Sequence, residues 1–405
     1  MFARSTRLWF LTGLVHLALG LALGLATAAP TPGLTGFPHA ILLVTAVAFM
    51  AGAILHGLTP AFAQRDADLP WLAIVPILLV VLGDGLWLAR QISGAPLLSA
   101  LAAPHALAWL AISAHAIVLR FVGTPWASPV DLFDASQPHR KGDYGAAVAL
   151  GAGALGLAVG AILLLVAPRG LPSSGLFVAL SAGILPMAYG GLAFVLPREV
   201  GARLDGVTLI IAGLVLLDLA VLFLTIGLIR PGAFDLRAPA AALLLAFWLA
   251  GHALIRTRLP AKLTPRLYTA RGLLRLLIGV ALLAGLAHFF AVFGGAPSTL
   301  LAMAFYASLV LAFGLTAAGL VIGARLLLPG EARVGRWAVV ATMLAILGLW
   351  ILTPYFVIGR SAFPGAVLLS AAGLVALRGL WPLAQPALGL DDHRTRQARR
   401  RHARD

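Results

Sequence analysis

Apolar runs of about twenty residues recur along nearly the whole chain, and they constrain its fold most. Crossing the ~30 Å hydrocarbon core of a bilayer as an α-helix takes roughly 20 such residues. Apolar residues make up 61% of the chain and its mean hydropathy is +1.00, well above the roughly half-apolar makeup of soluble domains. We therefore predict an all-α fold, a polytopic transmembrane helical bundle embedded in lipid.

Hydropathy, with Pro, Gly and charge punctuation, predicts about twelve spans. Together they form one transmembrane domain over residues 1–385, followed by a basic, disordered cytoplasmic tail over residues 386–405. The first run is some twenty residues long, longer than the ~7 to 15 of a secretory signal, which predicts a retained helix. The predicted spans are 8–28, 38–58, 71–89, 98–119, 145–166, 176–196, 207–228, 238–255, 272–293, 300–324, 337–357 and 363–383.

Basic residues are distributed unequally between the two sides of these spans. The N-terminus, the even-to-odd loops and the tail hold about 23 of the 29 Lys and Arg residues, and the opposite loops hold about five. The positive-inside rule then places both ends in the cytoplasm, in a cytoplasmic (inner) membrane. We therefore attribute the net charge of +15 to basic residues that set the topology and lie near anionic lipid headgroups, and we expect no nucleic acid partner.

The spans also suggest an internal repeat. Near the end of each of spans two, six and ten stands a glycine that is followed six to ten residues later by a proline, and each span runs into a short charged loop; the pairs are Gly52 and Pro60, Gly191 and Pro197, and Gly319 and Pro329. Three units of four helices are implied. Self-matching of any chain rich in Leu, Ala and Gly is the alternative explanation.

Two carboxylates fall inside predicted spans, where an ionisable group costs several kcal/mol. Asp84 lies in span three and Asp218 in span seven. Each is a candidate for a proton or cation relay. The alternative is a hydrogen bond to a neighbouring helix.

Histidines are sorted by depth in this topology. His39, His105 and His288 fall in the outer half of the membrane, and His16 is intermediate. Two histidines from different helices at one depth are what a bis-imidazole haem requires. A helix-to-helix hydrogen bond is the alternative for each of them taken singly.

The second span carries a resemblance to a known family. Its sequence FPHAILLVTAVAFMAGAILHGLTPAF resembles the corresponding segment of small relatives of haem-copper oxidase subunit I, including NnrS-type proteins. Such proteins show a histidine at the outer start of span two and a Gly, His, Pro exit. His39 lies thirteen residues before Gly52, and His56 with Pro60 matches the exit. The twelve-helix layout in three arcs is similar over most of the chain, whereas span two alone carries the motif.

Departures from that family limit what the resemblance implies. Spans six, seven and ten contain no histidine, so no copper centre of the family type is expected. Tyr306 stands thirteen residues before Gly319, where the equivalent of His39 would be. The resemblance implies haem held by His39, with His105, His288 or Tyr306 as the second axial ligand.

Three function classes follow from these observations. The first is a degenerate, haem-binding relative of subunit I with a role in respiratory electron transfer or a nitric oxide response, working with a respiratory-chain partner. The second is a twelve-span secondary transporter that uses an intramembrane Asp. The third is a non-catalytic assembly partner of a respiratory complex. Because the chain has no cysteine, thiolate metal sites are excluded.

Overall fold

The structure is a computed structural model. It describes residues 4–28, 38–63, 70–94, 98–123, 138–166, 172–229, 235, 237–259, 271–272, 274–275, 277–279, 281–282, 305–306, 308–319, 337, 340–341, 343–345, 347–348, 351 and 363–384. The predicted tail and His288 lie outside the described residues, as does most of the chain between the predicted spans nine and twelve.

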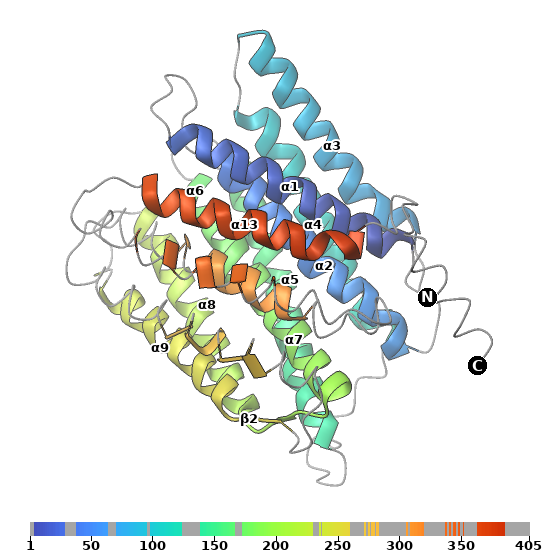
Figure 1. Cartoon of the computed structure of the whole chain (residues 1–405), viewed down its shortest axis with the longest axis vertical. Coiled ribbons are helices and arrows are strands. Elements are labelled where there is room, and N and C mark those ends of the chain that lie inside the picture. Colours follow the sequence, from blue (N-terminus) through green and yellow to red (C-terminus); the bar gives the residue numbers. More distant parts are fainter. Residues whose placement is uncertain are drawn as a thin grey trace.

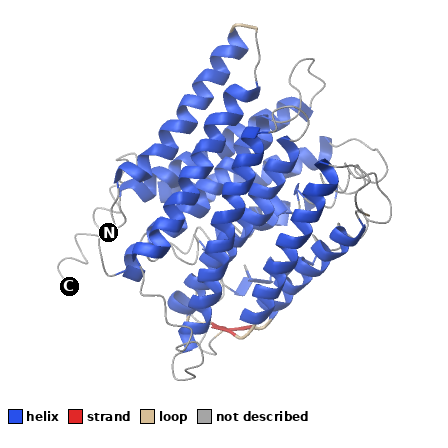
Figure 2. Ribbon diagram, turned by 180° about the vertical axis from the view of Figure 1, so that it is seen from behind, coloured by secondary structure: helices blue, strands red, loops and turns tan. Residues whose placement is uncertain are grey.

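The described residues are almost entirely helical, which confirms the all-α prediction (Figure 2). Four helices begin with proline, which lacks the N–H that a first helical position would leave without a partner. The helices are α1 (Arg4–Ala28), α2 (Pro38–Ala63), α3 (Pro70–Ile92), α4 (Leu98–Gly123), α5 (Pro138–Val166), α6 (Pro172–Val178), the π-helical turn η2 (Ala179–Ile184), α7 (Leu185–Val200), α8 (Val207–Ile229), α9 (Arg237–Ile255) and α13 (Phe363–Ala384).

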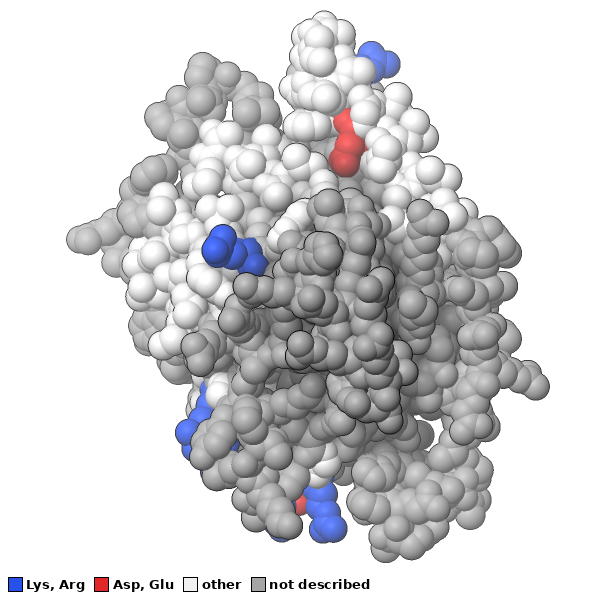
Figure 3. Space-filling model, turned by 45° about the vertical axis from the view of Figure 1, so that its right-hand side comes forward, with Lys and Arg blue, Asp and Glu red and all other residues white. Residues whose placement is uncertain are grey.

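Among the described residues, six helical segments are long and apolar enough to cross a membrane. The chain is therefore a multi-pass integral membrane protein. Charged side chains are sparse among the described residues on the face that Figure 3 shows. The six segments are Leu8–Ala26, Ala73–Ile92, Leu98–Ile117, Val148–Val166, Gly175–Leu196 and Val207–Gly227.

The helices pack mainly with neighbours in sequence. Helix α1 packs against both α2 and α13, and Figure 1 shows α1 and α13 side by side across one face. Helices α3 and α4 form one pair and α8 and α9 another, while α4 packs on α5. Helix α3 is peripheral, because only 22% of its apolar span is buried. Its exposed Leu78, Val81 and Leu82 suit contact with lipid.

The segment formed by α6, η2 and α7 is the buried centre of the bundle, with its whole span Gly175–Leu196 enclosed. Helix α5 approaches it closely through Gly156, where an added Cβ would collide with the backbone of Ala182 in η2. Small residues at such contacts let helix backbones come together in a membrane.

A short antiparallel pair of strands lies where α7 and α9 end (Figure 2). Strand β1 (Arg203–Leu204) pairs with β2 (Thr257–Arg258), so that Arg203 lies opposite Arg258. The Arg258 Nε donates to the Asp205 carboxylate at 2.9 Å. This exposed contact adds little stability on its own.

Ile54 of α2 marks a place where three predicted span exits come together. A Cβ added to Gly191 in α7 would lie 3.1 Å from Ile54, and one added to Gly319 would lie 3.2 Å from it. Ile54 itself follows Gly52 by two residues. The glycines near the ends of the predicted spans six and ten thus adjoin the Ile54 side chain, and Gly52 of span two lies in the same turn of α2 as Ile54.

Candidate functional site

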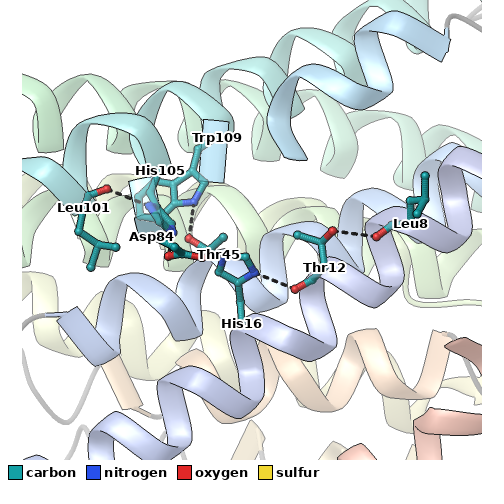
Figure 4. A network of polar contacts seen from close by, with 8 residues as sticks. All are labelled: Leu8, Thr12, His16, Thr45, Asp84, Leu101, His105 and Trp109. Carbon is teal, nitrogen blue, oxygen red and sulfur yellow. Dashed lines mark hydrogen bonds and ion pairs between the residues drawn. The ribbon is translucent and has the colours of Figure 1, made fainter. Parts of the chain in front are cut away.

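Three ionisable side chains from three helices converge inside the membrane-crossing segments (Figure 4). The Nε2 atom of His16 in α1 lies 3.1 Å from Oδ2 of Asp84 in α3. The Nε2 atom of His105 in α4 lies 3.5 Å from the other oxygen, Oδ1. We call these residues the His16–Asp84–His105 cluster.

Both imidazoles are oriented by their own helices. Each Nδ1 lies 2.8 Å from the backbone carbonyl oxygen four residues earlier, Thr12 for His16 and Leu101 for His105. Since a carbonyl oxygen only accepts, each Nδ1 carries the proton and donates it. Each Nε2 of a neutral ring then presents a lone pair to Asp84.

The cluster is enclosed unevenly. The imidazoles of His16 and His105 are 3% and 0% exposed, whereas the Asp84 carboxylate is 28% exposed at the edge of the peripheral α3. Phe49 of α2 stacks on the His16 ring at a centroid distance of 6.2 Å. The apolar surroundings strengthen electrostatic interactions at the cluster.

Helices α3 and α4 meet tightly beside Asp84. A Cβ on Gly83 would lie 2.9 Å from Pro104 and 3.0 Å from the Nδ1 of His105. On the other side of Asp84, a Cβ on Gly85 would meet no atom within 4 Å. Glycine at position 83 therefore lets α3 bring the carboxylate against His105.

A second buried polar contact supports the same region. The indole Nε1 of Trp109, one turn after His105, donates to the hydroxyl of Thr45 in α2 at 3.0 Å. Both side chains are fully buried. This hydrogen bond satisfies two polar groups that lipid could not and links α4 to α2.

The cluster needs a cation. Two neutral Nε2 lone pairs and an ionised carboxylate are all acceptors, so they repel one another unless protons or a metal ion lie between them. Neither Nε2 has a hydrogen-bond partner among the described residues, although each lies within ion-pair distance of Asp84. The arrangement can therefore bind protons or a metal ion.

The predicted haem ligands are divided between two places. The Nε2 of His39 in α2 lies 3.4 Å from the hydroxyl of Tyr306, so this predicted pair is in direct contact. His105 belongs instead with Asp84. Asp218 stands apart in α8, where its Oδ1 is buried and has no hydrogen-bond partner among the described side chains and backbone.

His16 is the residue that the sequence did not assign to a site. Its intermediate depth separated it from the outer-half histidines, and only the packing of α1 beside α3 brings it to Asp84. The sequence carries no signal for this contact, since the carbonyl oxygen of Thr12 that accepts from His16 is a backbone atom and would be present with any residue at position 12.

No protein-family model matches the chain, and no curated protein matches it.

Proposed function

We propose that this integral membrane protein moves a cation across the bilayer and binds it at the His16–Asp84–His105 cluster on the way. The observation that carries the proposal is the convergence of two imidazoles and a carboxylate from α1, α3 and α4, with Nε2-to-oxygen distances of 3.1 and 3.5 Å. This corresponds to a secondary transporter that uses an intramembrane Asp, with Asp84 as that residue.

Burial and exposure within the cluster support this role. A carboxylate that only joined helices would be expected to be enclosed with its partners, whereas Asp84 keeps 28% of its side chain exposed. The two imidazoles behind it are enclosed. A cation could thus meet the carboxylate first and the imidazoles second. Asp218 in α8 is a second candidate relay group on a different ground, since its Oδ1 is buried without a hydrogen-bond partner among the described residues.

Proteoliposomes test the proposal. When a proton gradient is imposed, the wild-type protein should acidify the liposome lumen. When a metal gradient is imposed, it should change the signal of a metal indicator trapped in the lumen. Asp84→Asn should lower that flux at least tenfold, while His252→Gln, at an exposed position of α9, should leave it unchanged. Equal flux through wild type, Asp84→Asn and empty liposomes would contradict the proposal.

A second candidate is a haem-binding relative of subunit I, favoured by the contact between His39 and Tyr306. Histidine and tyrosine are both axial haem ligands. Two ligands on opposite faces of one iron are separated by about twice a metal–ligand bond, roughly 4 Å. The pair, at 3.4 Å, would have to part to admit a haem, or His39 would act alone. The absorption spectrum of the purified protein, oxidised and then reduced, tests this.

The proposed layout has about twelve spans in three units of four helices. The protein would lie in the cytoplasmic (inner) membrane, with both ends of the chain in the cytoplasm. The approach of Gly191 and Gly319 to Ile54 supports the repeat, because equivalent span exits around one axis would meet near the centre.

A further inference from the structure

We infer that the His16–Asp84–His105 cluster is a site for a divalent transition-metal ion of the Zn²⁺ type. Its ligands are the Nε2 atoms of His16 and His105 and a carboxylate oxygen of Asp84. The inference rests on the proposed function in that it names the cation for the same cluster.

The spacing of the donor atoms suits such an ion. Metal–ligand bonds of about 2.0–2.1 Å in tetrahedral geometry put neighbouring donor atoms about 3.3 Å apart. The Nε2 of His16 lies 3.1 Å from one carboxylate oxygen of Asp84 and the Nε2 of His105 lies 3.5 Å from the other, so each imidazole is at about that spacing from one possible oxygen ligand. All three ligand atoms lie within 4.8 Å of one another.

The hydrogen bonds behind the ligands are those of a metal site. A histidine that ligates a metal through one ring nitrogen usually donates the other N–H to a carbonyl or carboxylate, which fixes its tautomer and orientation. Here both Nδ1 atoms bond to carbonyl oxygens, of Thr12 and Leu101, at 2.8 Å. Both Nε2 atoms are buried and lack hydrogen-bond partners within the described part of the chain.

The kind of donor selects the class of ion. Na⁺, Mg²⁺ and Ca²⁺ prefer oxygen ligands, whereas imidazole with one carboxylate suits Zn²⁺ and its first-row neighbours. Two histidines and one acid leave a fourth position open, as in exchangeable or catalytic zinc sites. Asp84, with 28% of its side chain exposed, is the least enclosed of the three ligands.

Metal binding can be measured on the full chain purified in detergent, stripped with a chelator and then dialysed against Zn²⁺. One equivalent should remain per chain, and X-ray absorption at the zinc edge should show two imidazole ligands and oxygen. Co²⁺ in its place should give the intense visible bands of a tetrahedral site. His16→Gln, Asp84→Asn and His105→Gln should each weaken Zn²⁺ binding by at least tenfold, whereas His252→Gln should not.

The outcomes separate this inference from the proposed function. Absence of stoichiometric Zn²⁺ from the wild-type protein would overturn the metal site, whatever the variants do, and a proton flux that still required Asp84 would leave the transport proposal standing. Bound Zn²⁺ with two imidazole ligands, without any flux in liposomes, would support the site and overturn transport. Bound Zn²⁺ that survives all three substitutions would place the metal elsewhere and contradict the inference.

Discussion

The Nε2 of His16 lies 3.1 Å from Oδ2 of Asp84, although the two residues belong to helices that are separated in sequence by the whole of α2. Helix α1 packs between α2 and α13. Helix α3 lies at the periphery and packs against α4. The contact therefore depends on how the α3–α4 pair is seated against α1. Changes in that seating should alter the cluster without replacing any of its side chains.

Gly83→Ala provides such a change. The new methyl group would lie about 3 Å from Pro104 and from the Nδ1 of His105, so α3 and α4 must separate or His105 must turn. Overpacking of this kind typically costs about 1–3 kcal/mol. We expect a lower midpoint of thermal unfolding and weaker cation binding.

Gly85→Ala is the matched control, because it flanks Asp84 on the other side and its Cβ would meet nothing within 4 Å. It should unfold at or slightly above the wild-type temperature, since alanine favours helix, and should bind the cation as wild type does. Equal effects of the two substitutions would contradict the tight α3–α4 contact.

Thr45→Val tests the buried link between α2 and α4. It removes the hydroxyl that accepts from the Trp109 indole and leaves a buried N–H without its partner, at a cost of about 1–3 kcal/mol. Thermal unfolding in detergent should show the loss. Adding Trp109→Phe to Thr45→Val should cost less than the two separate losses together, because the orphaned N–H is then gone. Additive losses would argue against the bond.

Topology is tested by reporter fusions. A reporter after Asp405 or next to Arg258 should behave as cytoplasmic, and one at Ser298 as external, because basic residues are concentrated on the first side. An external signal at Asp405 would contradict the count of about twelve spans.

The haem candidate makes its own prediction. If haem is bound, His39→Ala should abolish or strongly shift its absorption band, since His39 is the ligand in contact with Tyr306. His56→Ala, near the other end of α2, should leave the band in place. A band that is indifferent to His39 would remove this candidate.

Much of the helical layout could be predicted from the sequence, because membrane helices are set by local apolar length. The predicted spans 98–119 and 207–228 coincide with α4 and α8 to within a few residues. The local sequence also marked Asp84 as costly in a membrane. These predictions needed no knowledge of which helix lies beside which.

The composition of the site could not be predicted in the same way. Sorting histidines by depth grouped His39 with His105, but the two face different partners, Tyr306 and Asp84. Depth fixes one coordinate of a side chain, whereas its contacts depend on the rotation of each helix and on its neighbours. His16 meets Asp84 because α1 and α3 pack together, which no spacing within either helix encodes.

The most direct test of the central claim is a double-mutant cycle on cation flux in proteoliposomes, with His16→Gln, Asp84→Asn and the two combined. If these residues hold one cation as a unit, each substitution alone should lower flux at least tenfold and the double variant should be no slower than the worse single variant. His252→Gln controls for loss of a histidine as such. Wild-type flux in the double variant would contradict the claim. So would a double variant whose fold loss of flux equals the product of the two single losses, because His16 and Asp84 would then act independently.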